Sequence, residues 1–267
     1  MNILKNGCRR HGILAALILG LAAIAVLFAL ELLLLRGFGL NASSTAFILA
    51  DAALRFGLGI FVLFLLFRLE ITKNPGFRAK GLGKSLLLAW PFFLLFAGIL
   101  VFSLISAGLT GRSVGPGWVL TQIVFMASVG FFEELVFRAG VVNLIKNQLG
   151  GSRSALVKTA VMAAVIFSLA HCLNLIGHAD LTYTLSQVIT NFGMGLFLST
   201  LYLRTGNLIG PMIFHAVNDI VPAIAGQTLV DTQAAAAASS GLSPSILVTF
   251  VLYLALSAFY LRRVTGE

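Results

Sequence analysis

The sequence predicts an all-α, polytopic integral membrane protein with eight transmembrane helices. The chain has 267 residues, of which 59% are hydrophobic and only 10% are charged, and its mean hydropathy is +1.01. Apolar runs of roughly 18 or more residues recur along its length, and each is long enough to cross a ~30 Å hydrocarbon core as a helix. No remaining stretch is long and polar enough to form a soluble domain of useful size.

The charge distribution indicates membrane topology. The net charge is +9, but the basic residues lie in short connections between apolar runs, which is typical of topology signals and not of a nucleic-acid interface. We therefore expect no nucleic-acid partner. The two cysteines, Cys8 and Cys172, show no pairing pattern, so a disulfide framework is not expected.

The first three spans are predicted at about 12–35, 46–67 and 85–107. The first follows a basic tail, and we interpret it as an uncleaved anchor with a cytoplasmic start. The second contains Asp51 and Arg55 at a helical spacing of four, for which a buried compensating pair is favoured over a proton or ion path. In the third, Pro91 lacks an amide hydrogen and is expected to kink the helix.

Five further spans follow. The fourth begins near Trp118, the fifth covers about 156–176, and the sixth covers about 181–203. The sixth contains Gly193 and Gly195, small residues suited to close helix contact. The seventh covers about 208–224, and the eighth ends at Arg262-Arg263. Residues 234–240 between them are of low complexity, and we expect an outer loop there.

Alternating these spans from a cytoplasmic N-terminus places fifteen Lys and Arg residues inside and only Arg36 and Arg112 outside. This asymmetry predicts that both termini are cytoplasmic. The basic connections, above all 68–84, are expected to contact anionic lipid. The mainly short loops favour a prokaryotic inner-membrane protein.

An acidic stretch in the fourth span is the first candidate for chemistry. Glu133, Glu134 and Arg138 lie within an apolar region, where ionised groups are costly and usually functional. On a helix Glu134 and Arg138 share a face and can neutralise each other, while Glu133 points about 100° away and is free for chemistry. A purely structural ion pair between helices is an equal alternative on these residues alone.

Histidines on later spans supply possible partners for these carboxylates. His171 lies in the fifth span, and His215 and Asp219 lie in the seventh. These groups could converge on one polar pocket inside the bundle. At ~1.5 Å of rise per residue, Glu133 reaches the depth of the histidines only if the fourth span continues helically past Arg138, which places Arg138 inside the bundle.

Three motifs in order then carry a family resemblance. They are Glu133-Glu134-x-x-x-Arg138, Phe167-x-x-x-His171 and His215-x-x-x-Asp219. In this order on successive helices they resemble the motifs of the CPBP intramembrane proteases, the family of the Ras-converting CAAX prenyl endopeptidases. The resemblance covers about 118–224 and implies a conical catalytic bundle. We accordingly divide the chain into an N-terminal membrane region of unknown role (1–116), a catalytic core (117–225), and an outer loop with a last transmembrane helix (226–267).

The resemblance implies hydrolysis of a peptide bond near the C-terminus of a membrane-associated, prenylated CAAX-type or otherwise lipidated protein or peptide. Glu133 would act as general base on a water positioned by His171, while His215 and Asp219 would stabilise the oxyanion. Glu134, Arg138 and Phe167 would support them. Asp219 departs from the asparagine of the eukaryotic CAAX enzymes, so an amide donor there requires a protonated Asp219 or the neighbouring Asn218.

Other functions stay open at this stage. Glu133, His171 and His215 are also a possible hydrolytic zinc set, although the His-Glu-x-x-His signature is absent, and we favour the metal-independent version with no certain cofactor. A non-catalytic scaffold or bacteriocin immunity protein would not need three costly polar groups. A transporter is disfavoured because the sequence shows no internal repeat.

Overall fold

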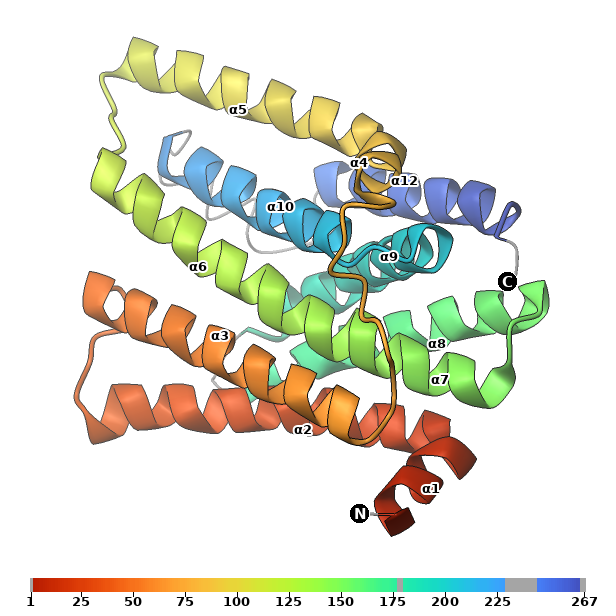
Figure 1. Cartoon of the computed structure of the whole chain (residues 1–267). Helices are drawn as coiled ribbons and strands as arrows, with labels where there is room; N and C mark the ends of the chain where they lie inside the picture. Colours follow the sequence, from red (N-terminus) through yellow and green to blue (C-terminus); the bar gives the residue numbers. More distant parts are fainter. Residues whose placement is uncertain (1, 177–179, 229–243, 265–267) are drawn as a thin grey trace.

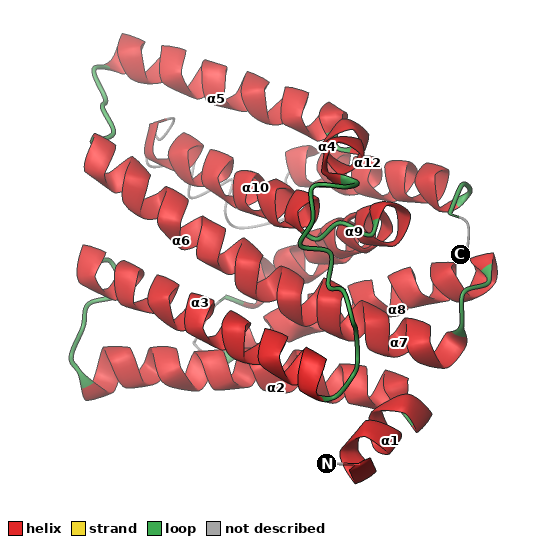
Figure 2. Cartoon of the chain, viewed as in Figure 1, coloured by secondary structure: helices red, strands yellow, loops and turns green. Residues whose placement is uncertain are grey.

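The computed structural model describes residues 2–176, 180–228 and 244–264. The described residues form helices joined by short loops, with no strand among them (Figure 2). In chain order the helices are α1 (Asn2–Arg10), α2 (Gly12–Leu32), η1 (Leu33–Gly37), α3 (Thr45–Arg68), α4 (Leu82–Leu88), α5 (Trp90–Thr110), α6 (Pro116–Glu134), η2 (Leu135–Val142), α7 (Asn143–Leu149), α8 (Arg153–Ala170), η3 (His171–Leu175), α9 (Leu181–Thr205), α10 (Ile209–Thr228) and α12 (Pro244–Leu261).

Among the described residues, six helices are long and apolar enough to cross a membrane. They are Gly12–Gly37, Thr45–Arg68, Trp90–Thr110, Pro116–Leu149, Arg153–Leu175 and Ile209–Thr228. The predicted sixth span forms the 25-residue helix α9, which is not one of the six, and the eighth forms α12, whose apolar part Ile246–Leu261 is shorter. The all-helical prediction is confirmed, while the count of eight crossings stays a prediction. The predicted loop at 234–240 lies outside the described residues.

The helices form one bundle around α6 and η2 (Figure 1). α3 and α10 pack along α6, α2 packs against η2 and α7, and α9 lies between α8 and α12. The α2–α3 and α5–α6 loops lie at one end of the bundle, and α1 and the C-terminal end of α12 lie at the other (Figure 1). Because every residue of η2 is buried, the middle of the fourth predicted span is the centre of the fold.

The fourth span continues past Arg138, as the sequence predicted. α6, η2 and α7 form one continuous apolar helix from Pro116 to Leu149. The stretch Leu135–Val142 is π-helical, a wider turn that often occurs at functional sites and that the sequence did not predict. Where it ends, the side chain of Asn143 donates to the Ala139 carbonyl and to the Tyr202 hydroxyl at 2.9 Å each.

The third predicted span is broken at the predicted place. α4 ends at Leu88, and Ala89 leaves the helical region with φ −91° and ψ 1°. Pro91 lies in the first turn of α5, where its missing amide hydrogen costs no intrahelical bond. The predicted kink is therefore confirmed as a change of helix direction between α4 and α5.

Glycines let α9 approach its neighbours closely, as predicted. A Cβ added at Gly193 would lie 2.9 Å from Phe250 of α12, and one added at Gly195 would lie 2.8 Å from Phe167 of α8. Close approach of helix backbones through small residues is a common means of helix association in membranes.

The basic connection between α3 and α4 is fixed to the α9–α10 turn. The Leu208 amide donates to the Gly76 carbonyl at 3.0 Å, and the Asn207 side chain donates to the Arg78 and Lys80 carbonyls at 2.5 and 3.3 Å. Gly76 has φ +99°, and a Cβ there would lie 2.7 Å from the Leu208 nitrogen, so only glycine fits. This loop therefore crosses the end of the bundle next to the start of α10.

Candidate functional site

Glu133 and Glu134 are the last two residues of α6, directly before the π-helical turn. The Oε1 of Glu134 lies 2.9 Å from Nη1 of Arg138, and both side chains are completely buried. The Arg138 guanidinium also lies over the Phe167 ring, 4.6 Å from its centroid, a cation–π contact that strengthens when water is excluded. The predicted pair of Glu134 with Arg138, and the position of Arg138 inside the bundle, are confirmed.

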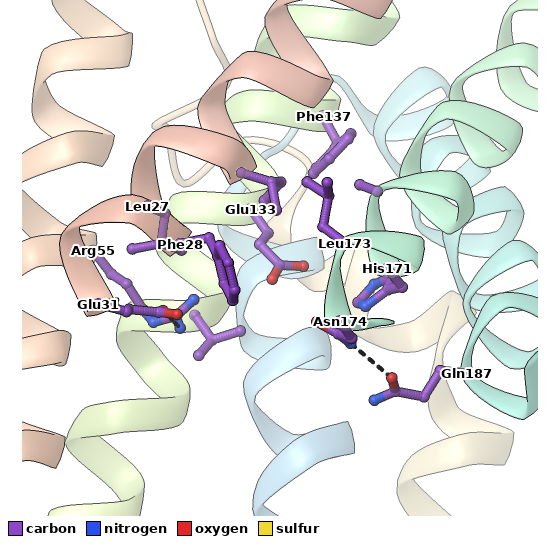
Figure 3. A pocket seen from close by; sticks show the side chains of 13 residues that line it. Leu27, Phe28, Glu31, Arg55, Glu133, Phe137, His171, Leu173, Asn174 and Gln187 are labelled. Atoms are coloured by element: carbon purple, nitrogen blue, oxygen red, sulfur yellow. Dashed lines mark hydrogen bonds and ion pairs between the residues drawn. The ribbon is translucent and has the colours of Figure 1, made fainter. Parts of the chain in front are cut away.

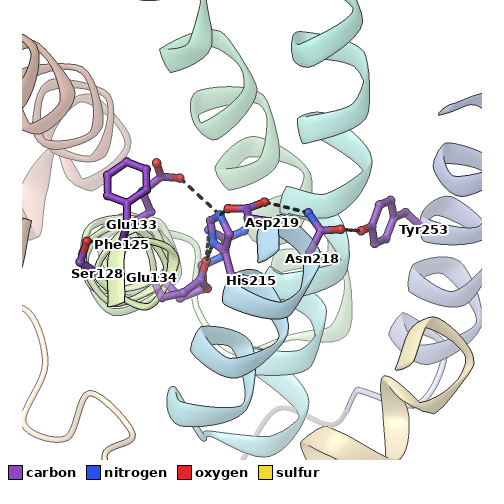
Figure 4. Close-up of polar contacts among 9 residues, drawn as sticks. Phe125, Ser128, Glu133, Glu134, His215, Asn218, Asp219 and Tyr253 are labelled. Atoms are coloured by element: carbon purple, nitrogen blue, oxygen red, sulfur yellow. Dashed lines mark hydrogen bonds and ion pairs between the residues drawn. The ribbon is translucent and has the colours of Figure 1, made fainter. Parts of the chain in front are cut away.

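His215 on α10 faces this carboxylate pair (Figure 4). Its Nδ1 lies 2.7 Å from Glu134 Oε1, so that Nδ1–H can donate to the carboxylate. Its Nε2 lies 3.7 Å from Oε2 of Glu133 and 3.5 Å from Oδ2 of Asp219. Glu134 thus fixes one edge of the imidazole, and the other edge faces Glu133 and Asp219.

His171 reaches the same place from α8. The α-helix ends at Ala170, and His171 begins the short 3-10 helix η3. Phe167, one turn earlier, meets the rings of His171 and His215 edge to face, with centroids 5.3 and 6.1 Å away. Phe167 therefore packs between Arg138 and both imidazoles and limits their orientations.

These side chains line one cavity of about 500 Å³. Glu133, His171, His215 and Asp219, which come from α6, η3 and α10, all contribute to its wall. The rest of the lining mixes apolar and uncharged polar residues: Met126, Val129, Tyr183, Ser186, Gln187, Thr190, Asn191, Met194, Asn218, Pro222 and Ile246. The structure thus brings the four predicted catalytic residues to the wall of a single cavity.

Asp219 belongs to a short chain of hydrogen bonds (Figure 4). The Asn218 amide donates to Asp219 Oδ1 at 3.1 Å, and the Tyr253 hydroxyl donates to Asn218 Oδ1 at 2.7 Å. A primary amide has two N–H groups, so one remains after the bond to Asp219. Tyr253 was missed from sequence, where it is one of several hydroxyl-bearing residues in the mainly apolar helix α12.

A second cavity, of about 240 Å³, lies against Glu133 and His171 on the side of α2 and α3 (Figure 3). Arg55 lines it and pairs with Asp51, Nε to Oδ1 at 3.1 Å, which confirms the predicted pair. Glu31 is a third partner, with Oε1 2.5 Å from Arg55 Nη2. Sequence reasoning missed Glu31, although a carboxylate inside the first apolar run was a visible signal.

The proposed zinc ligands do not form a metal site. Within the described parts of the chain, no group of three or more His, Cys, Asp or Glu side chains is arranged to hold a metal ion. The residues present therefore give the zinc alternative no support.

Comparison with known proteins agrees with the motifs. Residues 115–221 match the family model described as type II CAAX prenyl endopeptidase Rce1-like. This range contains Glu133, His171 and His215, and it omits α2, α3 and α12. No curated protein and no solved structure gives a significant match. Residues 115–221 are therefore a domain of the Rce1-like family of type II CAAX prenyl endopeptidases, which is a family of CAAX-type membrane proteases.

Proposed function

We propose that this protein is an intramembrane endopeptidase that cleaves a peptide bond near the C-terminus of a membrane-associated substrate by means of a glutamate-activated water. The observation that carries the proposal is the single cavity lined by Glu133, His171, His215 and Asp219. A general base, a second polar group beside it and donors for an oxyanion are the parts that peptide hydrolysis requires.

In this mechanism Glu133 takes a proton from a water as that water attacks the substrate carbonyl carbon. Glu133 is the carboxylate suited to this role because it lines the cavity, whereas Glu134 is already engaged by Arg138 and His215. His171 lines the same cavity and would orient the water. Glu133 then returns the proton to the leaving amine as the tetrahedral intermediate collapses.

The developing oxyanion would be stabilised from α10. His215 can donate from Nε2 when both ring nitrogens carry protons, and the Glu134 carboxylate fixes the ring so that Nε2 faces the cavity. The remaining amide hydrogen of Asn218 is a second candidate donor. It would replace the amide donor that an asparagine at position 219 would supply. Donors held in place before reaction cost no reorganisation when charge develops.

The family suggests a prenylated CAAX-type or otherwise lipidated substrate. We further propose eight crossings of a prokaryotic inner membrane with both termini in the cytoplasm, and contact of the basic loops with anionic lipid. A surface groove of about 410 Å³ offers one place for such a lipid. It has arginines Arg153 and Arg262 among mainly apolar walls, which suits a phosphate with its acyl chain.

The decisive experiment compares Glu133→Gln with wild type in detergent on a fluorogenic prenylated peptide. We expect Glu133→Gln to lose at least about 100-fold in kcat, because a general base contributes on the order of 10²–10⁴-fold, while its thermal unfolding stays close to wild type. Glu70→Gln is the matched control, because Glu70 is half-exposed and pairs with Lys5 at the surface. Normal cleavage by Glu133→Gln would exclude the proposed mechanism.

A further inference from the structure

Two cavities meet at the proposed catalytic carboxylate. Val129, Glu133, His171 and Gln187 line both of them, so these residues form the wall that the cavities share. The first cavity contains the His215 and Asp219 side chains. The second opens toward α2 and α3 (Figure 3), which lie outside the family-matched range 115–221. A peptide bond held at Glu133 would therefore have neighbouring substrate residues next to groups from the N-terminal helices.

The polar group on that side is an ion cluster of Glu31, Arg55 and Asp51. Arg55 places Nε and Nη2 against Asp51, at 3.1 and 3.2 Å, and Nη2 also contacts Glu31 at 2.5 Å. The Asp51 side chain is only 3% exposed, whereas that of Glu31 is 20% exposed. Glu31 and Arg55 line the cavity and Asp51 does not, so Glu31 is the carboxylate of this cluster that a substrate can reach.

The charges around this cavity sum to a negative value. Glu31 and Glu133 are the two carboxylates among the described lining residues, and Arg55 is the single Lys or Arg side chain among them; one positive charge and two negative charges give a formal −1. Arg55 is already held by two carboxylates, so it offers little attraction to an anionic group. Complementarity of charge therefore favours a cationic group and disfavours a carboxylate.

We propose that α2 and α3 supply a specificity subsite for a positively charged substrate side chain, Lys or Arg, close to the cleaved bond. Glu31 is the contacting carboxylate, and Asp51 positions it through Arg55. This inference rests on the proposed peptidase function, and it gives the N-terminal helices a part in substrate choice. A cluster that served only to join α2 to α3 would stabilise the fold without affecting which substrate binds.

The test uses prenylated peptides that carry Lys, Gln or Glu in turn at each position flanking the cleaved bond. With wild type, one position is expected to show a Lys-over-Glu preference in kcat/KM of about tenfold or more, expressed mainly in KM, since 1.4 kcal/mol corresponds to tenfold. Glu31→Gln should collapse that ratio toward one, and Glu31→Asp should restore part of it. Glu70→Gln at the surface is the control and should keep the wild-type ratio.

Binding of the same peptides to His215→Ala separates this inference from the proposed function. Lys-selective binding that Glu31→Gln abolishes in this background supports the subsite, even if wild type cleaves no peptide and the peptidase assignment fails. Equal binding of the Lys, Gln and Glu peptides overturns the subsite, as does a preference for Glu. A Lys preference that Glu31→Gln leaves intact overturns it too, because Glu31 would then not be its source.

Discussion

His215 Nδ1 lies 2.7 Å from Glu134 Oε1, and the same oxygen lies 2.9 Å from Arg138 Nη1. Glu134 therefore serves two partners through one atom, while its Oε2 has no hydrogen-bond partner in the described structure. This arrangement joins α6, η2 and α10 at the centre of the bundle. It also means that the charge balance of Arg138 and the orientation of His215 depend on the same carboxylate.

We predict that Glu134→Leu impairs both folding and turnover. The fully buried Arg138 guanidinium would lose its partner, and breaking a buried ion pair costs about 3–5 kcal/mol. Unfolding monitored in detergent should show a large fall in Tm. Cleavage of the fluorogenic peptide should fall by about 100-fold or more, because the proposed oxyanion donor loses its orienting group.

The double variant Glu134→Leu/Arg138→Met separates these two roles. Replacing a buried ion pair with apolar residues of similar size is often neutral or stabilising, so much of the lost Tm should return. Turnover should stay low, because His215 still lacks its carboxylate partner. Recovery of turnover together with Tm would show that Glu134 acts only on stability.

We predict that Gly130→Ala disturbs the site through the backbone. A Cβ at Gly130 of α6 would lie 2.9 Å from the Met212 carbonyl oxygen and 3.5 Å from the His215 Cβ, so α10 must shift. A displacement of even 1 Å at a catalytic group can cost about 100-fold in rate. The matched control is Gly98→Ala in α5, where a Cβ meets nothing within 4 Å. Equal activity of the two variants would contradict the close α6–α10 contact.

We predict that Asp219→Asn retains turnover, whereas Asp219→Leu loses about tenfold or more. The asparagine variant restores an amide at the position where the eukaryotic CAAX enzymes have one, and it can still accept from Asn218, whose Nδ2 lies 3.1 Å from Asp219 Oδ1. Leucine can neither donate to the oxyanion nor accept from Asn218. It therefore leaves the Asn218 amide without its hydrogen-bond acceptor. Measured kcat values for the two variants test this directly, and a loss in both would show that the carboxylate itself is required.

We predict that prolonged treatment with a metal chelator leaves kcat unchanged. Among the described residues no group of three His, Cys, Asp or Glu side chains is arranged to hold a metal ion, and the proposed mechanism uses Glu133 as the base. The measurement is turnover before and after chelation, with zinc added back. Loss of turnover that zinc restores would contradict the glutamate-activated mechanism.

The sequence predicted most helices because length and hydropathy determine them locally. It also predicted the Asp51–Arg55 and Glu134–Arg138 pairs, since a spacing of four on a helix places two side chains on one face. Both ion pairs are present in the structure. The continuation of the fourth span past Arg138 followed from the apolar residues after it. All of these predictions concern residues that are close to one another in the sequence.

Features that depend on tertiary packing were not predicted. The π-helical turn at Leu135–Val142 leaves no mark in the hydropathy pattern. Glu31 and Tyr253 reach their partners across 24 and 35 residues of sequence, distances at which spacing carries no information about contact. The position of α2 and α3 beside Glu133 was equally invisible, because no motif resemblance extended to those helices.

The attachment of the α3–α4 loop to the α9–α10 turn bears on how the protein could be shortened. Gly76, Arg78 and Lys80 present backbone carbonyls to Asn207 and Leu208, immediately before the helix that carries His215. An excised fragment limited to the family-matched range 115–221 would lack these carbonyls. The Asn207 side chain and the Leu208 amide would then lose their acceptors, and the start of α10 would lose its attachment to the loop. We therefore expect the smallest fragment that folds on its own to be larger than the recognisable domain and to include at least the α3–α4 loop.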